Sequence, residues 1–232
     1  MIVIGIVLLV VAVLAVLAAR AAYMLKTQIP GYREYWQTQN EKPAPKDALL
    51  YVALGDSVAQ GIGADSVEES YVRLFAKHIE EQSGKPVHII NLSVSGAKIK
   101  DVIDTQLPQL QDIARTPDIV TVDIGANDMR SFEPARFESE FETMLRQLPE
   151  NTLVADIPYF GPEFHGHGGR QAGQANVILT KLLPQHPVKR VGVYAVTDGN
   201  DSLRYYAADM FHPSSKSYRL WADAFIKAYE NN

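Results

Sequence analysis

Residues Leu49–Ser57 read LLYVALGDS, an apolar run that ends in glycine and is followed by an aspartate and a serine. A short, continuous apolar run closed by a glycine is typical of a buried parallel strand that leads into a tight turn. In open α/β sheets, ligands bind at the carboxyl ends of the strands, so Ser57 is a candidate reactive group. The tripeptide Gly-Asp-Ser alone favours an ordinary polar turn, because these residues are common in turns.

Strand-like and helix-like segments alternate along the rest of the chain. Further strands are predicted at 87–92, 118–124, 152–157 and 188–196. Helices are predicted at 68–83, at 99–114 with an interruption near Pro108, at 134–148, at 171–183 and from Ser214 or Ser215 onward. This alternation predicts an α/β fold in which one parallel sheet carries helices on both faces.

The composition narrows the class of protein. A chain of 232 residues with 47% hydrophobic residues is long enough to bury one substantial core, which suits a single domain after an N-terminal segment. The formal net charge of -5 argues against a nucleic-acid partner, because such proteins concentrate positive charge. The sequence has no cysteine, which excludes disulfides, thiolate catalysis and zinc-thiolate sites.

The N-terminal segment is uncharged and apolar from Ile2 to Ala19. About 20 such residues span the hydrocarbon core of a bilayer, so residues 1–25 are predicted to be a transmembrane anchor. A cleaved signal peptide is the alternative, because Ala19-Arg20-Ala21 resembles a small-residue cleavage site. The apolar run is longer than a usual signal-peptide core and no basic residue precedes it, which favours the anchor.

Residues 26–47 contain charged and polar residues and three prolines, and are predicted to be a juxtamembrane linker before a domain at 48–232. Tyr32, Tyr35 and Trp36 have two alternative interpretations. They either form a short amphipathic piece at the membrane interface, where aromatic residues are enriched, or pack on the domain.

Polar residues follow four of the predicted elements at the same edge of the sheet. The four blocks are Gly55-Asp56-Ser57, Asn91–Gly96, Gly125-Ala126-Asn127-Asp128 and Asp209-Met210-Phe211-His212-Pro213. Taken singly, each block is compatible with a turn, a helix cap or a solvated histidine. Their combination is more informative, because the four blocks supply complementary chemical groups.

Acyl transfer requires a nucleophile, a base, a group that orients the base and donors for the developing oxyanion. Ser57 is a candidate nucleophile, and His212 is a candidate base for its hydroxyl proton. The three-residue separation of Asp209 and His212 allows one turn to bring the carboxylate to the second ring nitrogen. The backbone N–H groups of Ser57 and Gly96 and the amide of Asn127 are candidate oxyanion donors.

The four blocks resemble, in content and order, those of the SGNH hydrolases, also called GDSL esterases and lipases. The resemblance covers about Leu49–Tyr229. It implies that Ser57 is the nucleophile, His212 the base and Asp209 its partner, with an oxyanion hole formed by Ser57, Gly96 and Asn127. It also implies a three-layer, flavodoxin-like fold with a five-stranded parallel sheet of order 2-1-3-4-5.

No metal or other cofactor is expected from this resemblance. His165 and His167 suggest a metal site at first sight, but they are separated by one glycine and have no third ligand at an obvious spacing.

Three functions are compatible with the sequence. The first is a membrane-anchored serine esterase that hydrolyses a lipid ester, such as a lysophospholipid, or a small acyl ester or thioester. The second is a carbohydrate O-acyl esterase or acyltransferase that acts on cell-envelope glycans. The third is a catalytically silent, membrane-bound binding module.

The expected location is the cell membrane, with one span or, after cleavage, secretion. Arg20, Lys26 and Arg33 follow the span, which by the positive-inside rule places the domain in the cytoplasm. The family resemblance instead implies an extracytoplasmic domain. Protease accessibility on intact cells decides between the two orientations, because only an external domain is cut without lysis.

Overall fold

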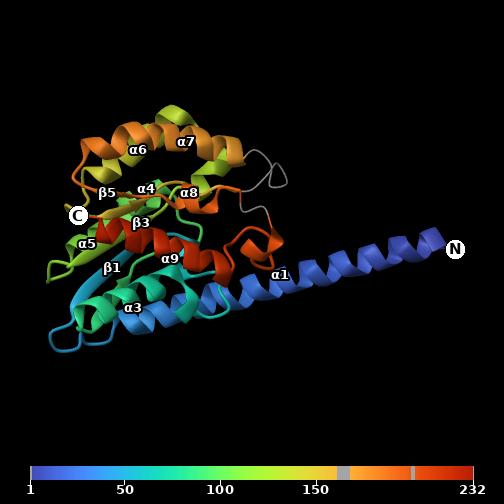
Figure 1. Ribbon diagram of the computed structural model, residues 1–232, viewed down its shortest axis with the longest axis horizontal. Coiled ribbons are helices and arrows are strands. Elements are labelled where there is room, and N and C mark those ends of the chain that lie inside the picture. The colour runs from blue at the N-terminus through green and yellow to red at the C-terminus, as the bar shows by residue number, and fades with distance from the viewer. Residues whose placement is uncertain (1, 161–167, 200–201, 232) are drawn as a thin grey trace.

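The computed structural model describes residues 2–160, 168–199 and 202–231 (Figure 1). Five parallel strands form one sheet in the order β2-β1-β3-β4-β5. The strands are β1 (Leu49–Gly55), β2 (Val87–Asn91), β3 (Ile119–Asp123), β4 (Leu153–Ala155) and β5 (Lys189–Val191). The predicted α/β fold and the predicted strand order are therefore confirmed.

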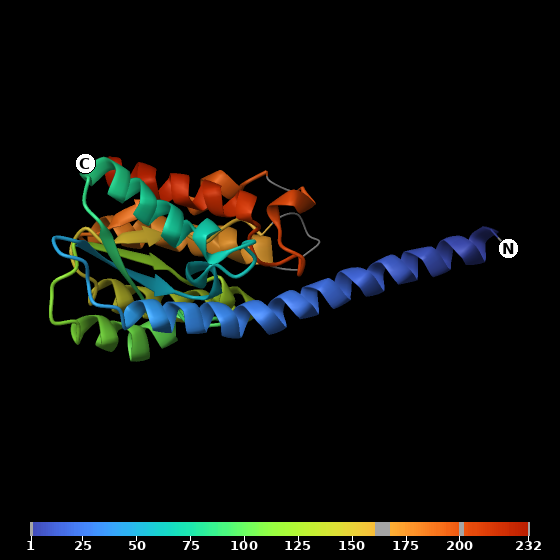
Figure 2. The same cartoon turned by 90° about the horizontal axis from the view of Figure 1, so that it is seen from below.

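Helices cover both faces of the sheet, so the domain has three layers (Figures 1 and 2). The sequence of β1 shows why: Tyr51 and Ala53 face one core, and Leu50, Val52 and Leu54 face the other. The first core contains residues of α3 (Tyr71–Ser83), α8 (Val193–Thr197) and α9 (Ser215–Glu230). The second contains residues of α4 (Ile99–Asp101), α5 (Leu107–Gln111), α6 (Pro134–Leu145) and α7 (Gly168–Leu182).

Two predicted elements differ from the observed ones. The fifth strand is predicted at 188–196 but ends at Val191, and the apolar residues that follow Gly192 form the helix α8. A short apolar run is compatible with a strand or with a helix. The recorded pairing of β5 with β4 ends at Val191, so the strand does not continue into the residues after Gly192. The helix predicted at 99–114, with an interruption near Pro108, is interrupted earlier, by a π-helical turn at Val102–Gln106 that lies between α4 and α5. Pro108 itself lies in the first turn of α5.

The segment predicted as a linker is helical as far as Asn40. It belongs to α1 (Ile2–Asn40), which is continuous through Pro30. Tyr32 donates a hydrogen bond to the carbonyl oxygen of Ala64, and Trp36 Nε1 donates one to that of Gln60, each at 2.9 Å. These acceptors lie after Ser57 in the sequence, so no local pattern reveals them. Of the two alternatives for the aromatic residues, packing on the domain is the observed one.

The end of α1 protects the edge of the sheet. The side-chain amide of Asn40 donates to the carbonyl oxygen of Asn91 at 2.9 Å and accepts from its N–H at 2.8 Å. Asn91 ends β2, which is an edge strand. Unpaired groups on such an edge are prone to pair with other chains, and Asn40 satisfies two of them.

We expect Trp36→Ala to destabilise the domain by about 3–5 kcal/mol, because it removes a buried aromatic side chain and leaves a cavity. Urea unfolding of the full chain in detergent measures this free energy. Tyr23→Ala is the control, since Tyr23 lies on the same helix but is 72% exposed, and it should change the free energy of unfolding little. A small loss for Trp36→Ala would contradict the view that this half of α1 belongs to the folded domain.

The first half of α1 has a different environment. Its large apolar side chains from Ile4 to Leu17 are about half exposed or more, and Figures 1 and 2 show this part of the helix projecting beyond the domain. Within the described residues, α1 is the one helix long and apolar enough to cross a membrane.

Candidate active site

Ser57 is the first residue of α2 (Ser57–Gln60), directly after β1. The chain turns between the strand and the helix at Gly55, whose φ is +147°. A Cβ atom on Gly55 would lie 2.2 Å from the carbonyl oxygen of Asp123 on β3, so this position accepts only glycine. The turn places Ser57 at the carboxyl edge of the sheet, as the sequence predicts.

A buried glutamine holds the end of β1. The side-chain amide of Gln106 donates to the carbonyl oxygen of Gly55 and accepts from its N–H, both at 2.8 Å. The sequence interpretation missed this residue. The available signal was its position between Val102 and Leu110, where helical spacing predicts an apolar side chain facing the core.

Ser57, His212 and Asp209 form one hydrogen-bonded chain. His212 Nε2 lies 2.9 Å from Ser57 Oγ, and His212 Nδ1 lies 2.5 Å from Asp209 Oδ2. A carboxylate only accepts hydrogen bonds, so Nδ1 carries the ring proton and Nε2 accepts from the serine hydroxyl. Ser57 is 6% exposed and His212 is 8% exposed, so the hydrogen bond between them is largely shielded from water.

The turn around Asp209 orders the histidine. Asp209 Oδ1 accepts hydrogen bonds from the N–H groups of Phe211 and His212 at 3.1 and 3.0 Å. Partial burial acts to raise the pKa of Asp209, but the hydrogen bond and the charge of His212 outweigh it, so the pKa lies below its ordinary value. Asp209 therefore stays ionised next to the imidazole at neutral pH.

Residues 206–213, here called the histidine loop because they include His212, pack directly against the segment that follows Ser57. A Cβ atom on Gly63 would lie 2.4 Å from the carbonyl oxygen of Pro213 and 2.9 Å from His212 Cβ. The φ of Gly63 is +98°, which also favours glycine. This close backbone approach brings together two segments that are about 150 residues apart in the chain.

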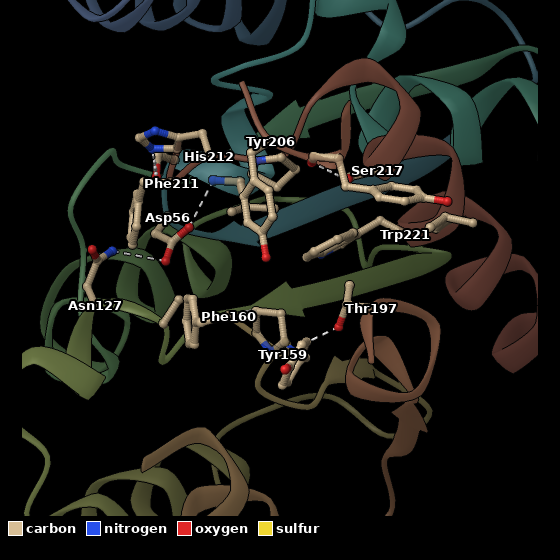
Figure 3. A pocket seen from close by; sticks show the side chains of 17 residues that line it. Asp56, Asn127, Tyr159, Phe160, Thr197, Tyr206, Phe211, His212, Ser217 and Trp221 are labelled. Atoms are coloured by element: carbon tan, nitrogen blue, oxygen red, sulfur yellow. Dashed lines mark hydrogen bonds between the residues drawn. The ribbon is translucent and has the colours of Figure 1, made fainter. Parts of the chain in front are cut away.

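Asn127 lies in the site, between two acceptors. Its Nδ2 donates to Asp56 Oδ2 and to the carbonyl oxygen of Ala97, both at 3.0 Å, and Figure 3 shows the amide turned towards Asp56. Both amide hydrogens are thus engaged. In contrast, the backbone N–H groups of Ser57 and Gly96 donate no hydrogen bond within the described part of the chain.

Asp56 connects Asn127 to the turn that carries Ser57. Its Oδ1 accepts from the N–H of Val58 at 2.9 Å and caps α2. Burial raises the pKa of Asp56 to about 6, although the hydrogen bond from Val58 lowers it. At neutral pH the carboxyl group is therefore ionised and accepts from Asn127. The sequence interpretation treated Asp56 only as part of a turn.

A pocket opens beside Ser57 and His212, and the empty space within it, including the part open to solvent, is about 600 Å³. Its wall is rich in aromatic and aliphatic side chains, shown in Figure 3 around the space next to Asp56. These side chains are Tyr159, Phe160, Tyr205, Tyr206, Phe211, Leu220 and Trp221. A wall of this composition suits an apolar group.

The described residues contain no group of three or more His, Asp or Glu side chains able to hold a metal ion. His165 and His167 lie outside the described residues.

The curated bacterial proteins to which the sequence is similar include an esterase and a lipase. It is 28% identical over 201 residues to the GDSL-like esterase Rv1075c of Mycobacterium tuberculosis, and this match covers 81% of the chain and 63% of Rv1075c. It is 23% identical over 199 residues to the spore germination lipase LipC of Bacillus licheniformis, which covers 75% of the chain and 93% of LipC.

The fold is similar to solved hydrolase structures. A variant of an acetyl xylan esterase from Geobacillus stearothermophilus superposes with a TM-score of 0.64 at 17% identity, over 78% of this chain and 94% of that one. The sequence model of the GDSL-like lipase/acylhydrolase family matches residues 53–220, which include all four polar blocks. The chain therefore belongs to the GDSL-like lipase/acylhydrolase family.

Proposed function

We propose that the protein is a serine esterase that hydrolyses carboxylic esters through an acyl-enzyme, with Ser57 as nucleophile, His212 as base and Asp209 as its orienting partner. The 2.9 Å contact between His212 Nε2 and Ser57 Oγ is the observation that carries this proposal. A serine hydroxyl is a poor nucleophile at neutral pH, and an imidazole within hydrogen-bond reach removes its proton as the bond to the acyl carbon forms.

In the first half of the reaction, Ser57 Oγ attacks the ester carbonyl carbon and its proton passes to His212 Nε2. The ionised carboxylate of Asp209 stabilises the resulting imidazolium. His212 then gives this proton to the leaving alkoxide, and the acyl group remains on Ser57. In the second half, His212 takes a proton from water, the hydroxide attacks the acyl carbon, and the proton returns to Ser57 as the acid leaves.

The developing oxyanion needs donors, and we assign this role to the N–H groups of Ser57 and Gly96 and to the amide of Asn127. The two backbone groups have no acceptor within the described residues, which suits them to bind an incoming oxygen. Asn127 takes part by sharing a hydrogen now directed to Asp56 or Ala97. Asp56 is thus a positioning residue that holds the amide at the site.

Asn127→Ala is expected to lower kcat by about a hundredfold or more, because one oxyanion donor contributes roughly 3 kcal/mol to transition-state stabilisation. KM should change less, since the donor acts mainly on the charge that develops during the reaction. Steady-state kinetics with p-nitrophenyl butyrate measures both constants. Near-normal turnover by a correctly folded variant would remove Asn127 from the oxyanion hole.

The aromatic wall of the cavity supports an ester with an apolar acyl group, so a lipid ester or a small acyl ester is the leading substrate class. A carbohydrate O-acyl ester is the second candidate, and the fold shared with an acetyl xylan esterase is the observation that favours it.

Initial rates with p-nitrophenyl esters of increasing chain length test the function and separate the two substrates. Rates that rise from the acetyl to the longer acyl esters support a lipid substrate, and rates that peak at acetyl support the carbohydrate ester. A folded protein that hydrolyses none of these esters and does not react with a fluorophosphonate at Ser57 would instead be a silent binding module.

We further propose that the apolar part of α1 remains attached as a single-pass anchor, with the hydrolase domain outside the cytoplasm. The length and the exposure of the apolar part support the anchor. Cleavage after Ala21 would instead remove this part, and α1 would then begin at Ala22. The packing of Trp36 and Asn40 supports a domain that begins within α1 rather than at residue 48.

A further inference from the structure

The exposed part of α1 leaves the domain on the side where the catalytic residues lie. Asp209 and His212 belong to the segment that precedes α9, and Figures 1 and 2 both show the exposed part of α1 projecting past this segment. The C-terminus of the chain lies at the opposite end of the domain. If a bilayer surrounds the apolar part of α1, the catalytic edge of the sheet faces that bilayer.

The helix is fixed to the domain close to this edge. Gln28 Nε2 donates to the carbonyl oxygen of Ala64 at 2.9 Å, and Gln28 Oε1 accepts from the N–H of Gly63 at 2.8 Å. Both acceptor and donor belong to the turn that follows Ser57. Because α1 is continuous from the apolar part to this joint, its rise of about 1.5 Å per residue sets the height of the site above the bilayer.

A groove runs between α1 and the histidine loop. Arg20, Tyr23 and Gln28 line one wall, and Tyr206, Ala207 and Ala208 line the other. Arg20 directly follows the apolar run that ends at Ala19, so the groove starts at the depth of the lipid headgroups. Tyr206 also lines the catalytic cavity, so this residue lies at the border between the groove and the cavity.

The surface beside Tyr206 has the composition of a membrane-contacting surface. Leu203 is 66% exposed. The Arg204 guanidinium and the Lys216 ammonium lie 5.1 and 4.9 Å from the centre of the Tyr205 ring. Aromatic and basic side chains of this kind settle at the headgroup level, where the cations attract lipid phosphates.

We propose that the catalytic cavity opens onto the membrane surface and takes its ester from the bilayer, with the acyl chain of a lipid passing along the groove between α1 and residues 206–208. This inference rests on the proposed esterase function and commits it to a membrane-resident amphiphile.

The test raises the site above the bilayer without altering it. An eleven-residue helical insertion between Ala19 and Arg20 adds about three turns, so it lifts the domain by about 16 Å and nearly keeps its rotation. The full chain is reconstituted in phosphatidylcholine vesicles. It is assayed with p-nitrophenyl palmitate in the bilayer and p-nitrophenyl butyrate in solution. The same insertion directly after Met1, on the other side of the span, is the matched control.

We expect the insertion after Ala19 to lower palmitate hydrolysis by about tenfold or more, because the site no longer reaches the lipid. Butyrate hydrolysis should stay within about twofold of the parent and shows that the domain is folded. Equal palmitate rates for the parent and both insertions would overturn the proposal. A parent that hydrolyses butyrate but not palmitate would overturn it while leaving the esterase function intact, and a parent that hydrolyses neither would overturn both.

A substitution tests the contact surface independently. Leu203→Asp should lower palmitate hydrolysis and leave butyrate hydrolysis unchanged, because it places a charge against the bilayer. Val177→Asp is the matched control, since Val177 is 59% exposed on α7 and lines neither the cavity nor the groove. Equal loss of palmitate hydrolysis in the two variants would overturn the role of Leu203 in membrane contact.

Discussion

Ser57→Ala should lower kcat for p-nitrophenyl butyrate by a factor of about 10⁴ or more. The reason is that Ser57 Oγ is the hydroxyl within hydrogen-bond reach of His212 Nε2, so its loss removes the group that would form the acyl-enzyme. Stability should change little, because the side chain is small and its recorded hydrogen bond is to His212. The measurements are steady-state kinetics and labelling by a fluorophosphonate, which reacts with an activated serine.

The control for this variant is Ser66→Ala. Ser66 is exposed and its side chain makes no capping hydrogen bond, so both activity and labelling should remain. Labelling that persists in Ser57→Ala, or turnover within about tenfold of the parent, would show that another residue is the nucleophile.

His212→Ala is expected to lower kcat by a similar factor, because it removes the imidazole that accepts the hydroxyl proton of Ser57. The effects of Ser57→Ala and His212→Ala should be far from additive, since the two residues act in one step. The double variant should therefore be about as active as either single one. Kinetics on all three proteins, with circular dichroism to confirm folding, makes the comparison.

The matched control is His186→Ala, because His186 is partly exposed and its recorded hydrogen bonds involve only its backbone. This variant should keep the activity of the parent. If the losses of Ser57→Ala and His212→Ala simply multiplied in the double variant, the two side chains would not act as one unit and the proposed mechanism would be wrong.

Much of the fold follows from local patterns. The apolar run of β1 and the helical spacing of Phe137 and Phe141 predict buried faces because strands and helices repeat side-chain directions at fixed periods. The strand order came from the family resemblance. The end of β5 was missed because four to eight apolar residues carry no period that separates strand from helix.

The candidate site, like the fold, is predicted in part by the sequence and in part determined by the tertiary structure. By itself, the sequence determined which residue types stand at the carboxyl edge of the sheet, since turn residues after apolar strands mark that edge. Only the tertiary structure decided how they are held. Asn127 donates hydrogen bonds to Asp56 and to the carbonyl oxygen of Ala97, and the N–H of Gly55 donates one to Gln106. These hydrogen bonds join residues about 30 to 70 positions apart, so they form only once the sheet has brought their segments together, and no local pattern encodes them. The packing of α1 has the same origin, because Trp36 finds its acceptor only in the folded turn after Ser57.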